Sequence, residues 1–528
     1  MIIFKKAGAF FIRTAESKRA SLLLCFIAGA IGALPYFIDA LFILTLVSLV
    51  AQFYVAFRQK QLYSRIYKPF FYYFLGLYLP LYSFLSEMYP FDRFGFNASQ
   101  ATFVLICACI GIPMLHACIQ ATFMLLSKFL KGNVQELFGY SALWVLNEWL
   151  LTLGFMAFPW GGVAVSMTGC LPYLQTASLF GKYFITFITA FACVAFAKAL
   201  IERKAVLSIV ASLIIVINTV VGCVLWAIPV KSSESVDVAL IQGNVLSNEK
   251  WDSENQGTIF SRYTEMASEA AEKGVDIVLL PESAIPNHFV KNGALHRAFA
   301  EIASVYDVTL VVGVQYYEPE TKESFNAVVA VYPNGSVSDH YDKRHLVPFG
   351  EFIPFADVIG RFLPFVAELN QGSSSFTEGT EAVILNTEKA KVAPLVCFDS
   401  IFTSYAREGV NGGADILAIV TNDSWFNDSV GVYTHLRHAQ LRAIENQRYI
   451  IRAANTGVSA YIDAKGQILF KTEPLVCDVA YERVYTVEGR TLYSHIGDIP
   501  VTISFIIVLS FVIINIYNTV RSKKNGNH

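Results

Sequence analysis

The sequence predicts two unlike parts, a multi-pass α-helical membrane domain and a layered α/β domain that faces water. Charged residues make up only 16% of the 528 positions and hydrophobic residues 54%, whereas a soluble domain has about 25% charged residues. The mean hydropathy is +0.47. Long apolar runs fill the first half of the chain, and strand-like and helix-like stretches alternate in the second half.

A membrane-spanning helix needs roughly 20 apolar residues in a row. Seven such runs come before the polar region and one follows it, so we expect about eight spans. They cover 21–37, 38–57, 69–88, 100–127, 138–157, 180–200, 205–229 and 499–517. The first run is long and further spans follow it, so we expect no cleaved signal peptide.

The spans divide the chain into three regions. We expect an N-terminal transmembrane domain at 1–231 with seven spans, a globular domain at 232–493, and a last transmembrane helix with a tail at 494–528. Lysine and arginine gather at both ends and in alternate short loops, and such basic segments stay in the cytoplasm. Both termini should therefore be cytoplasmic. Seven crossings then place the globular domain on the far side, which in a bacterium is the periplasmic face of the inner membrane.

Charge and cysteine content exclude several classes of protein. The net charge of −2 gives no reason to expect a nucleic-acid partner. Most of the nine cysteines lie in the apolar half, where they are expected to be small buried hydrophobic residues. Only Cys397 and Cys477 lie in the polar half, and no metal-ligand spacing is present. We therefore predict no metal site and no disulfide framework.

The globular region alternates between the two kinds of regular structure. Such alternation is typical of layered α/β architecture. Predicted strands cover 236–241, 276–280, 309–314, 327–332, 392–396, 415–421, 449–453 and 458–462. Predicted helices cover 261–273, 295–305 and 434–447.

Three segments place a reactive side chain after an apolar stretch. They are DIVLLPES with Glu282, DKRHLVPFGEFIP with Lys343 and Glu351, and APLVCFDS with Cys397. Active sites of layered α/β folds form at strand ends. A thiol can attack a carbonyl carbon, a carboxylate can take the thiol proton, and an ammonium can stabilise the resulting oxyanion. The three groups together therefore suit covalent acyl transfer.

Each of these residues also has a simpler interpretation. A cysteine at a strand end is commonly buried filler, and Pro-Glu after a strand is commonly a turn. Lys343 stands beside Asp342 and Arg344, as lysines on solvated faces do. Because the three segments are far apart in the sequence, spacing alone does not unite them.

The same segments resemble the three catalytic segments of the nitrilase (carbon–nitrogen hydrolase) superfamily. Within it, the membrane context resembles the apolipoprotein N-acyltransferases, which finish bacterial lipoproteins. The resemblance covers nearly the whole chain, and HLVPFGE after the lysine combined with FPW makes it specific. It rests on NEWLLTLGFMAFPWGG (147–162), IQGNV (241–245), HLVPFGEFIP (345–354), TNDSWF (421–426) and RYIIRAANTGVSA (448–460). It implies a nitrilase-like four-layer α-β-β-α sandwich for the globular domain.

The resemblance also implies roles for single residues. Cys397 would be the nucleophile that becomes a thioester, and Glu282 the general base. Lys343 would line the oxyanion site together with the backbone N–H of Phe398. Glu351 matches a second essential glutamate, which would orient Lys343 or the incoming amine.

Other matched positions belong to the expected substrate pocket or support it. Asn326, Trp425 and Phe426 match substrate-binding positions, and Phe398 also shapes substrate entry. Asp399 stands where the family often has glutamate, so the charge is kept but the side chain is shorter. Asp399 is therefore expected only to support the site, and it could equally cap the helix after Cys397.

The implied reaction has two halves and needs no cofactor. The cysteine takes an acyl chain from a phospholipid, with phosphatidylethanolamine as the expected donor. The α-amine of the N-terminal diacylglyceryl-cysteine of an apolipoprotein then takes the chain from the thioester. The expected partners are these two substrates and the bilayer.

The segment 349–376 is long and rich in Phe, Leu and Ile. Long connections are usually functional. It could be an arm that dips into the membrane interface and gates the pocket, or a helical hairpin packed on the domain.

Two other functions stay open from the sequence. A membrane-tethered nitrilase-type amidase would use water in place of the lipid amine. A non-catalytic membrane scaffold or receptor is the alternative from another class, although Glu282, Lys343 and Cys397 are all present. A transporter is a weaker option, because the spans carry few charged residues.

Overall fold

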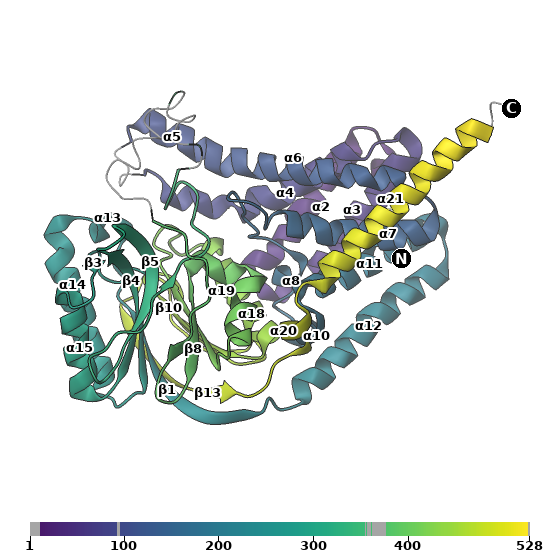
Figure 1. The fold of residues 1–528 in the computed structure, drawn as a ribbon. Helices are drawn as coiled ribbons and strands as arrows, with labels where there is room; N and C mark the ends of the chain where they lie inside the picture. Colours follow the sequence, from purple (N-terminus) through teal and green to yellow (C-terminus); the bar gives the residue numbers. More distant parts are fainter. Residues whose placement is uncertain (1–10, 92–95, 354, 356–360, 362–375, 526–528) are drawn as a thin grey trace.

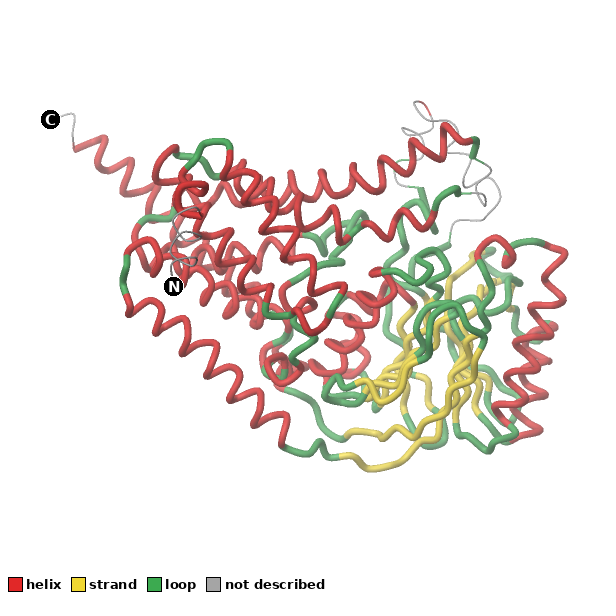
Figure 2. Tube along the Cα trace, turned by 180° about the vertical axis from the view of Figure 1, so that it is seen from behind, coloured by secondary structure: helices red, strands yellow, loops and turns green. Residues whose placement is uncertain are grey.

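The structure is a computed structural model that describes residues 11–91, 96–353, 355, 361 and 376–525. A bundle of long helices lies against an α/β domain, and α21 returns from that domain along the bundle (Figure 1). From behind, the bundle of long helices occupies one side of the molecule, and the strands lie on the other side with further helices flanking them (Figure 2). The two expected parts are thus both present.

Within the described residues, six helical stretches are long and apolar enough to cross a membrane. They are Ala20–Phe37, Asp39–Tyr63, Ala98–Phe129, Lys182–Glu202, Ala205–Ala227 and Ile499–Ser522. In helix labels these are α2 (Ala20–Phe37), α3 (Leu44–Tyr63), α5 with α6 (Ala98–Ile106 and Ile112–Phe123), α11 (Lys182–Glu202), α12 (Ala205–Ala227) and α21 (Ile499–Asn525).

Two expected spans do not reach this length or apolarity. Helix α4 (Tyr67–Leu81) has 15 residues and continues into a short 3-10 turn, whereas crossing a bilayer takes roughly 20. Helix α7 (Gly132–Leu150) has 19 residues but carries Glu136 and Glu148. The expected count of about eight spans is therefore approximate.

The α/β domain contains two sheets. The first has seven strands, in the order β13-β1-β2-β4-β5-β6 with β3 paired to β4, and the second has the order β12-β11-β10-β9-β8-β7. Strands of the first sheet are β1 (Ser232–Gln242), β2 (Ile277–Leu280), β3 (His288–Phe289), β4 (Thr309–Glu318), β5 (Glu323–Val331), β6 (Tyr341–Asp342) and β13 (Asp478–Val487). Strands of the second are β7 (Leu385–Asn386), β8 (Lys391–Val396), β9 (Ile416–Thr421), β10 (Tyr449–Ala454), β11 (Ala460–Ile462) and β12 (Ile468–Lys471).

Three apolar layers hold these elements together. Helices α14 (Gln256–Ala271) and α15 (Ala294–Tyr306) pack on the outer face of the first sheet. Side chains such as Leu279 and Val392 fill the space between the two sheets. Helices α18 (Thr403–Asn411) and α19 (Val430–Asn446) cover the second sheet. The expected four-layer α-β-β-α sandwich is thereby confirmed. The three predicted helices correspond to α14, α15 and α19.

Helix α19 also joins the α/β domain to the membrane helices. The Arg437 guanidinium lies 2.8 Å from the Asp39 carboxylate, and His438 Nε2 lies 3.1 Å from the Trp160 carbonyl oxygen. Near the C-terminal end of α19, Glu445 accepts a hydrogen bond of 3.0 Å from the backbone N–H of Lys182. Because α19 is buried on both sides, it fixes the second sheet against the bundle.

Candidate active site

Strand ends from both sheets deliver the reactive groups to one place. Glu282 follows β2, Lys343 follows β6, and Cys397 follows β8. Strand β4 passes so close to the first of these turns that a Cβ on Gly313 would lie 2.4 Å from the Pro281 carbonyl oxygen. A glycine is therefore required there for the Glu282 turn to pack against the sheet.

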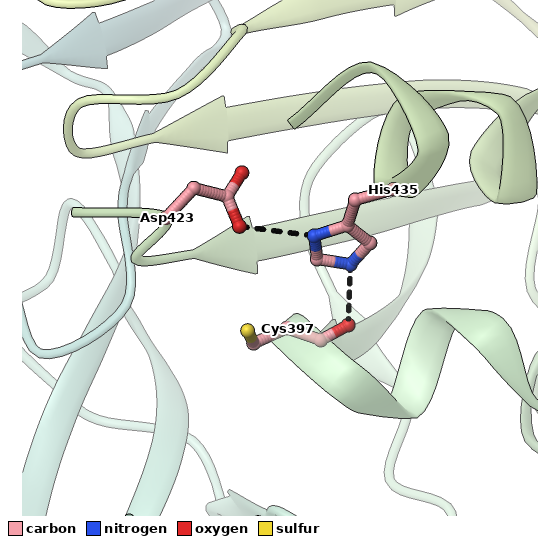
Figure 3. A group of neighbouring side chains, drawn as sticks. All are labelled: Cys397, Asp423 and His435. Carbon is pink, nitrogen blue, oxygen red and sulfur yellow. Dashed lines mark hydrogen bonds and ion pairs between the residues drawn. The ribbon is translucent and has the colours of Figure 1, made fainter. Parts of the chain in front are cut away.

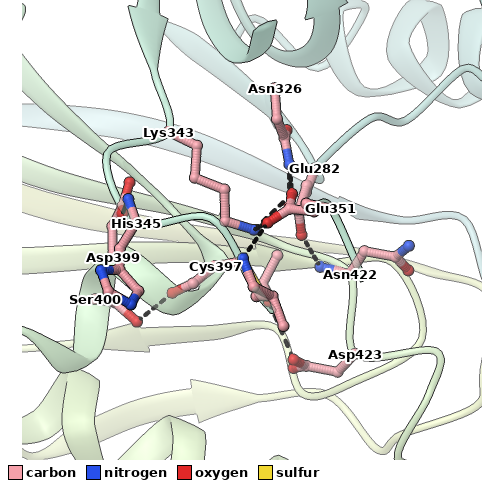
Figure 4. Close-up of polar contacts among 12 residues, drawn as sticks. Glu282, Asn326, Lys343, His345, Glu351, Cys397, Asp399, Ser400, Asn422 and Asp423 are labelled. Carbon is pink, nitrogen blue, oxygen red and sulfur yellow. Dashed lines mark hydrogen bonds and ion pairs between the residues drawn. The ribbon is translucent and has the colours of Figure 1, made fainter. Parts of the chain in front are cut away.

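Glu282, Asn326, Lys343 and Glu351 form a buried group that we call the Glu–Lys cluster (Figure 4). The Lys343 ammonium lies 3.1 Å from a Glu282 oxygen and 2.9 Å from a Glu351 oxygen. Asn326 Nδ2 donates to both carboxylates at 2.7 Å. The second Glu282 oxygen accepts a hydrogen bond of 2.8 Å from the backbone N–H of Asn422, at the end of β9 in the other sheet.

The Glu–Lys cluster keeps Lys343 charged. Burial alone would lower the pKa of Lys343, but the Glu282 and Glu351 carboxylates outweigh it and hold the pKa well above its ordinary value. Lys343 is therefore an ammonium ion at neutral pH. The cluster thus places two carboxyl groups around one ammonium.

Cys397 is half-buried and begins a 3-10 turn, Cys397–Ile401. Its φ is +49°, in the left-handed region that non-glycine residues seldom adopt. Burial and then the Glu282 charge raise the pKa of the thiol, while the Lys343 charge lowers it. The net pKa lies well above its ordinary value, so the resting thiol keeps its proton. Nucleophilic use of this sulfur requires a base, and Glu282 is the carboxylate of the Glu–Lys cluster whose charge acts on the thiol.

Asp399 connects the Lys343 loop to the Cys397 turn. Its carboxylate accepts hydrogen bonds from the backbone N–H groups of Arg344 and His345, at 3.2 and 2.9 Å, and from the Tyr341 hydroxyl at 2.9 Å. Burial raises the pKa of this carboxyl to about 7 against the opposing effect of Lys343 and these donors. The side chain does not cap α18, whose N-cap residue is Phe402. The helix-capping alternative is therefore wrong.

Aromatic rings from the membrane part lie against the residue after the cysteine. The Phe398 ring stacks on Phe158 with centroids 5.7 Å apart and lies 6.3 Å from Trp160. Phe158 and Trp160 belong to the FPWGG turn after α7, which Glu148 holds by accepting the Val163 N–H at 2.8 Å. The membrane part thus forms one wall of the site.

The remaining predicted pocket residues lie in different surroundings. The Phe426 ring lies 5.9 Å from the Trp160 ring and 4.8 Å from Phe84. Trp425 is half-buried in the turn between β9 and α19. Asn326 lies between the two carboxylates, so its N–H groups are already used within the Glu–Lys cluster.

Most of the segment 349–376 lies outside the described residues, and so do the arm and hairpin alternatives for it. Its described beginning meets the membrane part. The rings of Phe352 and Phe355 lie 6.4 and 5.2 Å from Phe155, which stands between α7 and the FPWGG turn.

A second buried group was not anticipated from the sequence. His435 Nδ1 lies 3.0 Å from one Asp423 oxygen, and Arg452 donates to the other at 2.8 Å. We call these three residues the histidine network. Asp423 and Arg452 stand in segments that carry the resemblance, but nothing in the sequence near His435 indicates its partner. Three-dimensional contact is the signal that finds it.

The Cys397 sulfur, a carboxylate oxygen of Asp423 and a ring nitrogen of His435 lie within 4.8 Å of one another, and all three are atom types that bind metals (Figure 3). Burial alone would raise the pKa of Asp423, but His435 and Arg452 lower it to about 2. Asp423 is thus an ion already paired with a guanidinium, which would repel a metal cation. The arrangement suits a hydrogen-bond network better than a metal centre.

Comparison with known proteins supplies the family. Residues 237–484 match the carbon-nitrogen hydrolase family, and residues 20–195 match the apolipoprotein N-acyltransferase N-terminal domain. An apolipoprotein N-acyltransferase of Geobacter metallireducens is 32% identical over 380 residues, which cover 70% of this chain and 72% of the relative. The chain belongs to the apolipoprotein N-acyltransferase family.

A second relative agrees with this assignment. An apolipoprotein N-acyltransferase of Haemophilus influenzae is 27% identical over 500 residues, 92% of each chain. Among solved structures, a nitrilase-superfamily protein of Saccharomyces cerevisiae covers 48% of this chain and 91% of its own, with 18% identity and a TM-score of 0.39. By its two family matches and its long apolar helices, the protein is a membrane-embedded member of an N-acyltransferase family with a carbon–nitrogen hydrolase domain.

Proposed function

We propose that this chain moves an acyl chain from a phospholipid to the N-terminal diacylglyceryl-cysteine of bacterial apolipoproteins, through a thioester on Cys397. The observation that carries the proposal is the Glu–Lys cluster beside a protonated thiol, next to a wall built by the membrane part. In this scheme Cys397 is the nucleophile, Glu282 the general base, and Lys343 with the Phe398 N–H the oxyanion site.

In the first half-reaction, the Cys397 thiol gives its proton to Glu282 and its sulfur attacks the ester carbon of the donor, for which we propose phosphatidylethanolamine. The oxygen of the tetrahedral intermediate takes negative charge, which the Lys343 ammonium stabilises. The ester C–O bond then breaks, and Glu282 returns the proton to the leaving lysophospholipid oxygen. Glu351 keeps Lys343 charged and in place.

In the second half-reaction, the α-amine of the acceptor attacks the thioester carbon. Glu282 removes a proton from the attacking nitrogen, the C–S bond breaks, and the proton returns to the sulfur. The product is an amide, and Cys397 is free for the next cycle. The order is ping-pong, because lysophospholipid leaves before the amine reacts.

The membrane part explains how such substrates reach the thiol. Exposing an acyl chain to water costs about 0.8 kcal/mol per CH₂ group. Phe398, the residue after the thiol, lies against Phe158 and Trp160 of the membrane part, so an acyl chain can reach the site along these rings without that cost. The basic N-terminal and C-terminal segments support cytoplasmic termini and a periplasmic catalytic domain at 232–493.

Intact-mass analysis tests the first half-reaction. The purified full-length protein is incubated with phosphatidylethanolamine, and we expect one acyl adduct that maps to Cys397 and is removed by hydroxylamine. A Cys477→Ser variant should form the same adduct, whereas Cys397→Ser should form none.

Adding a peptide with a diacylated N-terminal cysteine tests the second half-reaction. The adduct should be lost as the peptide gains one amide-linked acyl chain. Hydrolysis of the thioester to free fatty acid at the same rate with and without peptide would contradict the transferase and favour an amidase-like use of water. Absence of any adduct would exclude the thioester route.

A further inference from the structure

The carbonyl group of Cys397 lies on the opposite side of the residue from its sulfur, under a buried imidazole (Figure 3). His435, which is 1% exposed, has its Nε2 3.1 Å from the Cys397 carbonyl oxygen. The Ser400 hydroxyl donates to the same oxygen at 2.7 Å and lies 3.0 Å from His435 Nε2. Two side chains therefore meet one backbone carbonyl of the nucleophile.

These contacts determine where the imidazole carries a proton. A carbonyl oxygen only accepts hydrogen bonds, and the Ser400 proton is already directed at the carbonyl. His435 Nε2 must therefore be protonated and donate to this pair of oxygens. Its Nδ1 lies 3.0 Å from an Asp423 oxygen and 3.2 Å from an Arg452 guanidinium nitrogen, which also donates to Asp423 at 2.8 Å. Because Nε2 is engaged with the carbonyl and Nδ1 with Asp423 and Arg452, the imidazole in this arrangement is not the base that takes the thiol proton.

The backbone of Cys397 needs such support. A non-glycine residue in the left-handed region costs of order 1–3 kcal/mol and persists only when its surroundings hold it there. With a φ of +49°, the sulfur and the carbonyl lie on opposite sides of the residue, and the carbonyl points toward His435 of α19 (Figure 3). Holding the carbonyl thus fixes the direction of the sulfur.

We infer that His435 is a positioning residue for the nucleophile: its Nε2–H, oriented by Asp423 and Arg452, holds the Cys397 carbonyl so that the thiol stays presented to Glu282 and Lys343. The inference rests on the proposed function only in taking Cys397 as the residue that is acylated.

The experiment compares two substitutions in the full-length, detergent-solubilised enzyme. His435→Leu removes the donor, whereas His435→Gln offers an amide N–H in its place. In single turnover with phosphatidylethanolamine, we expect His435→Leu to form the acyl adduct about 100-fold more slowly, as misplaced reacting groups do. His435→Gln should recover about tenfold of that loss, with half-saturating lipid changed less than about twofold in both variants.

His296→Leu is the matched control. His296 is also buried, and its Nε2 lies 3.0 Å from the Gly335 carbonyl oxygen, but it belongs to α15 on the outer face of the first sheet. This variant should lose stability while each folded molecule keeps the parental rate. The thermal unfolding temperature of every variant is measured alongside.

Equal losses in His435→Leu and His435→Gln would overturn the inference, and so would a parental rate in His435→Leu. If His435→Leu does not fold, Ser400→Ala removes the second donor to the same carbonyl and should slow acylation about tenfold. An unchanged rate in that variant overturns the inference as well.

Alkylation of Cys397 by iodoacetamide, followed by peptide mapping without lipid, separates this inference from the proposed function. Alkylation should be slower in His435→Leu and restored in His435→Gln. If alkylation follows this pattern across the variants but the parent forms no acyl adduct, the thioester route fails and the positioning role stands. If the parent forms the adduct and His435→Leu forms it equally fast, only the positioning role fails.

Discussion

The two buried polar groups beside Cys397 differ in their composition and in what they touch. The Glu–Lys cluster sets two carboxylates against one ammonium, and its charges act on the thiol. The histidine network sets one carboxylate between a guanidinium and an imidazole, and it touches the backbone carbonyl. We propose that the Glu–Lys cluster exchanges a proton with the sulfur. The histidine network already engages both of its ring nitrogens and both carboxylate oxygens of Asp423, which suits holding the backbone.

The largest effect should follow from removing the cation of the Glu–Lys cluster. Lys343→Met loses the oxyanion partner and leaves the Glu282 and Glu351 carboxylates facing each other. We expect acyl-enzyme formation to fall by about 10³-fold or more, measured by intact mass in single turnover. Lys389→Met is the control, since Lys389 pairs with Asp276 at the surface and should be dispensable. A Lys343→Met variant that acylates within tenfold of the parent would contradict the difference between the two groups.

Removing the cation of the histidine network should instead reduce stability. Arg452 and Asp423 are both 0% exposed, and breaking such a buried pair costs about 3–5 kcal/mol. Arg452→Met should therefore lower the thermal unfolding temperature of the α/β domain strongly. Arg483→Met breaks an ion pair whose side chains are 56% and 40% exposed. Such a surface pair contributes about 0–1 kcal/mol to the free energy of unfolding. Similar shifts in the two variants would show that the histidine network does not hold the fold.

The smallest effect concerns Asp399, which links the Lys343 loop to the Cys397 turn. Its folded pKa of about 7 lies above the unfolded value of about 3.9, so the folded state keeps a proton that the unfolded state loses. Stability from this group is present below the unfolded pKa and is lost as pH rises toward 7, by at most about 1.4 kcal/mol per pH unit.

Asp399→Asn cannot ionise and should not show this loss. Thermal unfolding of the parent and of Asp399→Asn, followed between about pH 4 and pH 7, checks the sign. As the pH rises, the unfolding temperature of Asp399→Asn should increase relative to that of the parent. A gap that stays constant would mean that Asp399 is ionised throughout and that its three donors outweigh burial.

The local sequence pattern predicted those helices and strands whose structure depends mainly on residues close in the sequence. Alternation of strands and helices was enough for β2, β8, β9 and α14, because each buries an apolar face that its own residues display. It was not enough for β13, because β13 pairs with β1, which stands at the opposite end of the domain's sequence. The start of α19 at Val430 was also missed, since Val-Gly-Val is a weak helix former and only the Ser429 cap and burial on both sides stabilise that turn.

By itself the sequence determined that a membrane part precedes a layered α/β domain, because hydropathy and periodicity are local properties. It also marked Glu282, Lys343 and Cys397 as reactive groups after apolar stretches. Only the tertiary structure decided that Asp399 ties two loops together, that Phe158 stacks on Phe398, and that His435 meets the Cys397 carbonyl. Each of these contacts joins residues distant in the chain, so no local pattern encodes it and packing of the whole fold creates it.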